Sequence, residues 1–142
     1  MIALEPIGFV RHQAASVPRH WSVSEVQGRL EIEPRYAPGL ADIRTGQRIV
    51  VLFHFDRSPA FTPDELAQRP PHRDRALGVF SICSPIRPNP LGLSVLEVLR
   101  VEDHTVHVRG LDMYDQTPLL DIKPHIEVAR ECPSYADEAD GQ

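Results

Sequence analysis

The chain contains few cysteines and no long apolar run. Its two cysteines, Cys83 and Cys132, lie far apart, which argues against a disulfide framework, and no four-ligand zinc spacing is present. The longest apolar run, Ile49 to Phe53, is too short to cross a bilayer, and no basic region precedes an apolar core at the N-terminus. These absences predict a soluble, cytoplasmic protein without a membrane partner.

Positive charge is also scarce. Lys and Arg number 15 against 20 Asp and Glu, for a formal net charge of -5. Neutralising many phosphates requires an excess of Lys and Arg, so we expect no DNA partner and no broad nucleic-acid footprint. One local basic cluster remains, formed by Arg69, His72, Arg73 and Arg75. No G-x-G-x-x-G motif follows a strand, so a dinucleotide-binding fold is not expected either.

Proline and glycine are abundant, at 14 and 8 residues, and they follow no repeat period. Such a composition favours many turns and short strands over collagen or disorder. A length of 142 residues fits one domain with a real core. We therefore predict a single domain over residues 1–142, with its core at about 5–126 and an acidic tail at 130–142.

Short β-favouring runs recur along the chain. The strongest, Gln47 to Phe55, has a continuous apolar middle and predicts a central strand covered on both faces. Helical turns are expected within Ala37 to Arg44 and after Thr62, which begins a capping box with Pro63 next to it. The pattern indicates an all-β fold with short helical turns in the loops. The other expected strands are Pro6–Arg11, Leu30–Pro34, Gly78–Cys83, Leu91–Val101 and Thr105–Val108.

The segment GVFSICSPIRPNPLGLS, residues 78–94, contains a hinge stiffened by Pro85, Pro88 and Pro90. These prolines fix backbone angles and remove three donors, so the hinge forms neither a helix nor a ladder strand. Ser84, Arg87 and Asn89 supply polar groups on this rigid loop. Two interpretations stay open, a ligand site and a connection that only turns a corner.

Other polar clusters also have two interpretations. The loop containing Pro18-Arg19-His20-Trp21 is either a lid or a place where Trp21 plugs the core. His54 and Asp56 follow a buried strand on one face, which suits half of a metal site or an ordinary strand exit. The segment GLDMYDQTPLLDIKP is either one ligand site, in which its carboxylates and Lys123 act together, or a turn residue followed by a surface ion pair. The carboxylates of that segment are Asp112, Asp115 and Asp121.

Two of these segments together identify a family resemblance. GVFSICSPIRPNPLGLS and GLDMYDQTPLLDIKP resemble the paired signatures of the TsaA-like, or TrmO, family, and PIGFV, PRHW and VVLFHFDR extend the resemblance over most of residues 5–126. The resemblance implies a small antiparallel β-barrel that binds S-adenosylmethionine and works as a homodimer. It also implies N6-methylation of threonylcarbamoyl-adenosine beside the anticodon, with the tRNA anticodon loop as partner.

The resemblance also implies roles for individual residues. Arg87, Asn89, Asp121 and Lys123 would place the substrate and handle its proton, with Asp121 as the base. Three positions depart from the family pattern, because Cys83, Gln116 and His125 stand where arginine, glycine and tyrosine are usual. The implied cofactor positions are Pro18, Arg19, His20, His54, Phe55, Cys83, Leu93, Asp115, Gln116, Thr117 and Pro118.

Two alternative functions compete with a methyltransferase. The first is a non-catalytic module that binds S-adenosylmethionine without turning it over. The second is a metal-dependent small-barrel enzyme using His54, Asp56 and His72. Co-purified metal would favour the second, because such ligands hold divalent ions tightly.

Overall fold

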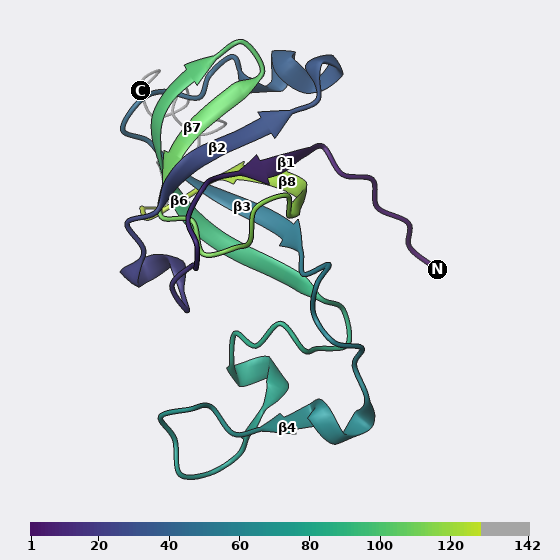
Figure 1. Cartoon of the computed structure of the whole chain (residues 1–142). Coiled ribbons are helices and arrows are strands. Elements are labelled where there is room, and N and C mark those ends of the chain that lie inside the picture. Colours follow the sequence, from purple (N-terminus) through teal and green to yellow (C-terminus); the bar gives the residue numbers. More distant parts are fainter. Residues whose placement is uncertain (129–142) are drawn as a thin grey trace.

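The computed structural model describes residues 1–128, which form a closed antiparallel barrel (Figure 1). Around the barrel the strand order is β1-β2-β7-β6-β3-β8. The predicted all-β barrel is therefore confirmed, while the predicted tail, residues 130–142, lies outside the described residues. The barrel strands are β1 (Gly8–Arg11), β2 (Gln27–Ile32), β3 (Arg48–His54), β6 (Leu91–Glu102), β7 (Thr105–Arg109) and β8 (Pro118–Pro124).

Strand β3 lies between β6 and β8, so its predicted central position is confirmed. Its side chains alternate, with Ile49, Val51 and Phe53 buried inside the barrel. Val50 and Leu52 point outward and are only half-buried, so the expectation of cover on both faces is wrong. A closed barrel of one sheet has a single interior, and the outer side of β3 has no second layer over it.

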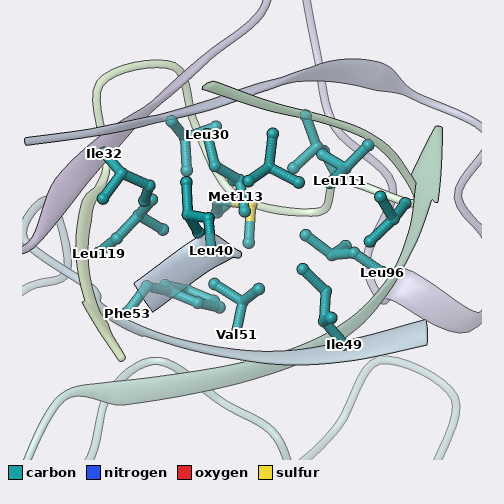
Figure 2. Close-up of a cluster of buried hydrophobic side chains, with 14 residues drawn as sticks. Leu30, Ile32, Leu40, Ile49, Val51, Phe53, Leu96, Leu111, Met113 and Leu119 are labelled. Carbon is teal, nitrogen blue, oxygen red and sulfur yellow. The ribbon is translucent and has the colours of Figure 1, made fainter. Parts of the chain in front are cut away.

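The barrel interior is filled with side chains rather than solvent. Leu96 and Leu119 have no exposed surface, and Leu40 and Met113 lie among the inward-facing strand residues (Figure 2). Small barrels have an interior just wide enough to be packed in this way. Any ligand site must therefore lie at an end of the barrel or on its surface.

Within residues 1–128 four short 3-10 helices occupy the loops, namely η1 (Trp21–Val23), η2 (Pro34–Leu40), η3 (Pro63–Leu66) and η4 (Val79–Ser81). The predicted helical turns thus exist, although η2 begins at Pro34, before the expected segment. The predicted capping box at Thr62 is wrong in detail, since the Thr62 side chain makes no capping hydrogen bond. A single 3-10 turn offers little for such a cap to stabilise.

Residues 55–90 leave the barrel between β3 and β6 and form an excursion to one side of it (Figure 1). The Phe55 N–H donates to the Pro90 carbonyl at 2.8 Å and closes its base. Within it, β4 (Ala67–Gln68) pairs with β5 (Leu77–Gly78). The predicted strand over Gly78–Cys83 is wrong, because beyond Gly78 the excursion offers no neighbouring strand and the chain turns into η4.

No helix among residues 1–128 is both long enough and apolar enough to span a membrane.

Replacing Leu96 with alanine should remove a fully buried side chain from the barrel interior. We expect the free energy of unfolding to fall by about 2–5 kcal/mol, from lost transfer energy and the cavity left behind. Leu66→Ala is the matched control, because Leu66 is 49% exposed on η3. Urea denaturation of both variants measures the difference, and equal stabilities would contradict this description of the core.

Candidate functional site

A cavity of about 600 Å³ lies outside the packed barrel interior, between the barrel and two of its loops. Its walls come from residues 17–21, from the end of β3, from the hinge and start of β6 at 82–93, and from residues 112–117. These segments are far apart in the sequence. The barrel brings them together, because β3 pairs with β6 and the Val10 carbonyl accepts a hydrogen bond from Gln116. The size suits a small-molecule ligand.

The cavity collects most of the predicted site residues. The predicted site residues among its lining are Pro18, Arg19, His20, Phe55, Cys83, Arg87, Leu93 and Thr117. Four other predicted residues, His54, Asp115, Gln116 and Pro118, are sequence neighbours of lining residues without belonging to the lining, and Asn89 lies two residues from Arg87 and from Leu91. The hinge therefore lines a cavity, so it does more than turn a corner.

An apolar slot forms one side of the cavity. The rings of Phe53 and Phe55 meet edge to face with centroids 5.0 Å apart. A Cβ on Gly92 would lie 2.2 Å from the Phe53 ring, so only glycine lets the ring pack against β6 here. The sequence analysis missed Phe53 and Gly92. The pairing of an aromatic residue with a strand glycine becomes visible only once the register of β3 and β6 is known.

Arg87 makes the hinge rigid from within. Its Nη1 donates to the carbonyls of Ile82 at 3.0 Å and Ser84 at 3.1 Å. The Ser84 hydroxyl oxygen accepts from the Ile86 N–H at 3.2 Å. These bonds, with three prolines, hold Cys83 at the cavity, where it is exposed. Arg87 thus shapes the cavity wall as well as lining it.

The loop before β2 forms the opposite wall. His20 and Trp21 lie with ring centroids 4.9 Å apart, and the Arg48 guanidinium lies 5.8 Å from the Trp21 ring centroid. Trp21 is half-buried and lies outside the core cluster. The interpretation of Trp21 as a core plug is therefore wrong, and the loop borders the cavity instead.

Asp112 contributes a carboxyl group to the cavity wall. It accepts a hydrogen bond from the hydroxyl of Ser94, a fully buried residue, at 2.5 Å. Burial raises the pKa of Asp112, and the bonds from Ser94 and from the backbone N–H of Trp21 offset part of that rise. The sequence analysis noted Asp112 together with Asp115 and Asp121, but it did not predict a cofactor or substrate role for Asp112.

The neighbouring turn holds Asp115 and Gln116. Asp115 accepts from the backbone N–H of His12 at 3.0 Å, which lowers the pKa of its carboxyl group. It joins two loops distant in sequence and is therefore more than a local turn residue. Gln116 has a φ of 70°, the left-handed region that favours glycine, at a position where the family pattern has glycine.

Asp121 and Lys123 lie away from the cavity. They form an ion pair at 3.0 Å and line a second cavity, of about 490 Å³. Of the two interpretations of this segment, the surface ion pair fits Asp121 and Lys123, because Asp121 lines a different cavity from Asp112. The reason is that β8 runs about 3.3 Å per residue and carries Asp121 along the barrel from the turn.

No group of three or more His, Cys, Asp or Glu side chains among residues 1–128 is placed to hold a metal ion. His54 and Asp56 follow β3, and the Asp56 N–H donates to the His54 carbonyl at 2.8 Å. The metal-dependent alternative thus loses the cluster it requires in this part of the chain.

The fold and the cavity define the class of protein, a single-sheet β-barrel with a small-molecule site built by its loops. Residues 10–130 match the model of the tRNA-methyltransferase O N-terminal domain, and the chain belongs to this family. The predicted family is confirmed. This membership makes S-adenosylmethionine-dependent methyl transfer the activity to propose and test below.

Three similar proteins support this assignment. A "Probable S-adenosyl-L-methionine-binding protein" of Archaeoglobus fulgidus is 37% identical over 128 residues, covering 88% of this chain and 34% of the relative. A mouse "tRNA (adenine(37)-N6)-methyltransferase" is 41% identical over 76 residues, and the match covers 54% of this chain and 18% of the mouse protein. A crystal structure of TrmO from P. aeruginosa has a TM-score of 0.69 at 26% identity, and the match covers 93% of this chain and 59% of the solved chain. The chain thus spans about a third of the first relative and three fifths of the solved one.

Removing the Arg87 guanidinium should loosen the hinge without unfolding the barrel. In Arg87→Ala we expect faster hydrogen exchange at the amides of residues 82–86, because the bonds to the Ile82 and Ser84 carbonyls are lost. Arg75→Ala is the control, since Arg75 is an exposed arginine of the same excursion. Exchange rates equal to wild type at 82–86 would refute the bracing role of Arg87.

Proposed function

We propose that this chain is an S-adenosylmethionine-dependent methyltransferase that acts on tRNA. The observation that carries the proposal is the cavity, which gathers Pro18, His20, Phe55, Cys83 and Thr117 from separate segments at positions implied for the cofactor. Random placement on a barrel surface would scatter such residues. Membership of the tRNA-methyltransferase O family supports the same activity.

The cavity residues fit this cofactor chemically. Phe53 and Phe55 offer an apolar slot for a base, and Arg19 and Arg87 offer donors for a carboxylate. Asp112 offers negative charge toward a cationic centre. When bound, the cofactor supplies an electrophilic methyl group. The chain binds it, orients it and excludes water, and positioning dominates the rate of such a displacement.

We propose N6 of threonylcarbamoyl-adenosine, beside the tRNA anticodon, as the methyl acceptor. The name of the mouse relative supports a tRNA adenine, and exposed arginines of the cavity wall and of the excursion supply local positive charge in an acidic protein. Phosphate contacts need only such a local patch for positioning. These arginines are Arg57, Arg69, Arg73 and Arg75.

A homodimer is part of the proposal. The outer face of the barrel carries Leu91 and Leu93 of β6, which are 46% and 53% exposed, beside the outward-facing Leu52. Leu52 is paired with Leu93 on one side and Asp121 on the other. A two-fold axis near Leu52 would set Asp121 and Lys123 of one protomer against the cavity mouth of its partner. There Asp121 would act as the base and Lys123, with Arg87 and Asn89, would place the acceptor.

A non-catalytic cofactor-binding module is the second candidate. It is favoured by the name of the Archaeoglobus fulgidus relative, which mentions binding of S-adenosylmethionine and no transfer. Both candidates require binding, and turnover alone separates them.

S-adenosylmethionine should bind one site per chain and raise the melting temperature, because a ligand bound only by the folded state stabilises it. Calorimetry measures the binding, and mass spectrometry of tRNA incubated with protein and cofactor measures the transfer. Gly92→Ala should weaken binding, because its Cβ pushes the Phe53 ring into the slot, whereas Gly39→Ala meets nothing within 4 Å. No binding at millimolar cofactor would end the proposal, and binding without transfer would favour the second candidate.

Lysine at position 52 should break the dimer. Leu52→Lys places a charge in the middle of the outward apolar face, and burying an unpaired charge is costly. Thr105→Lys is the control, on β7, which β6 separates from β3. We expect light scattering to give a dimer for wild type and control and a monomer for Leu52→Lys. A monomeric wild type at tens of micromolar would refute the dimer.

A further inference from the structure

The charges that line the cofactor cavity are unevenly arranged. Only two acidic residues belong to the lining, Asp56 and Asp112, and Asp56 is exposed. Asp112 is partly buried in the wall formed with Ser94 and Trp21. The remaining titratable groups of the lining are Arg19, His20, Arg57, Cys83, Arg87 and Tyr114.

Asp112 is held in place by neutral groups. The Ser94 hydroxyl donates to its carboxylate, and no ion pair among residues 1–128 includes it. The backbone N–H of Trp21 and the neighbouring His20 lower the pKa of Asp112, but burial has the larger effect and raises it. A partly desolvated carboxylate without a paired cation is unfavourable, and a cationic ligand would relieve the cost.

We propose that Asp112 supplies the counter-charge that selects the sulfonium cofactor over its neutral demethylated product. The inference rests on the proposed function, since it concerns the same cavity. S-adenosylmethionine and S-adenosylhomocysteine share the base, the ribose and the amino-acid tail. They differ in the methyl group and the positive charge on sulfur, so a carboxylate facing that charge favours the substrate and releases the product.

Two features favour Asp112 over Asp56 for this role. Partial removal from water strengthens an electrostatic interaction, whereas an exposed carboxylate is screened. The Ser94 hydrogen bond at 2.5 Å also fixes the direction of the Asp112 carboxyl group. Arginines of the same lining are available to the cofactor's own carboxylate, so the cationic and anionic ends of the ligand have different partners.

The test compares the two ligands rather than measuring activity. Wild type, Asp112→Asn and the control Asp42→Asn are titrated by calorimetry with S-adenosylmethionine and S-adenosylhomocysteine. Asp42 is an exposed carboxylate beside the second cavity. We expect Asp112→Asn to lose roughly 10-fold or more in affinity for S-adenosylmethionine, the effect of one nearby opposite charge, with little change for the product. Asp42→Asn should match wild type for both ligands.

A purely structural role for Asp112 predicts other results. If Asp112 only ties the loop at Trp21 to the barrel, Asp112→Asn should lose both ligands equally and melt at a lower temperature. If the Asp112 carboxylate instead costs folding stability, Asp112→Asn should melt at an unchanged or higher temperature at pH 8, because the asparagine amide carries no charge that must be desolvated. Equal losses for the two ligands, or no loss, would overturn the proposal. Failure of wild type to bind either ligand would instead refute the proposed function.

A second variant, Ser94→Ala, keeps the Asp112 carboxyl group and changes its pKa. The Asp112 pKa is raised, so the preference for S-adenosylmethionine should fall as pH drops through that pKa and the carboxylate is protonated. Ser94→Ala removes a hydrogen bond that favours the ionised form, so the fall should begin at higher pH. The His20→Gln variant should show the same pH-dependent fall in preference for S-adenosylmethionine, and this result would exclude His20 as the titrating group. A preference that is independent of pH in all three proteins would contradict the assignment.

Discussion

Closure of the barrel is the constraint on which the rest of the structure depends. Six strands satisfy one another's backbone groups in a ring, so no strand edge needs protection. The ring is narrow, and side chains such as Leu30, Leu96 and Leu119 fill it completely. A barrel of this size has no room for a ligand inside. The cavity that collects most of the predicted site residues is therefore built by loops held against the outside of the barrel.

Those loops are fixed by bonds that join distant segments. Arg87 braces the hinge through the Ile82 and Ser84 carbonyls, and Asp115 joins the turn before β8 to His12. Asp112 joins the segment after β7 to Ser94 of β6. Each bond is worth little alone, but together they hold polar groups at defined places around the cavity before any ligand arrives. Preorganisation of this kind matters most in a reaction that depends on positioning.

Charged residues are distributed unevenly over the protein. The chain is acidic overall, at -5, while arginines concentrate around the cavity and the excursion. Such a distribution offers positive charge locally rather than along the whole surface. Leu52 of β3 lies between Leu93, which lines the cavity, and Asp121, so Asp121 and Lys123 of the same chain do not reach the cavity and the proposal places them in a second protomer.

The sequence by itself determined the fold class, the main strands and the family. The continuous apolar middle of Gln47–Phe55 and the β-favouring run Leu91–Val101 were enough to locate these two strands, although they did not show that β3 buries only one face. Three residues of the paired motifs, Arg87, Cys83 and Thr117, line one cavity, and their roles there stay predictions. Local patterns contain this information, since they depend on neighbours along the chain.

Only the tertiary structure decided which of these residues meet. The strand expected over Gly78–Cys83 failed because pairing needs a partner strand, and the excursion provides none past Gly78. The packing of Phe53 against Gly92 follows from the register of β3 and β6. The distance of Asp121 from the cavity follows from the register of β3 and β8, which is irregular at Leu52/Phe53. Register and closure are properties of the whole sheet, so no stretch of sequence read alone determines them.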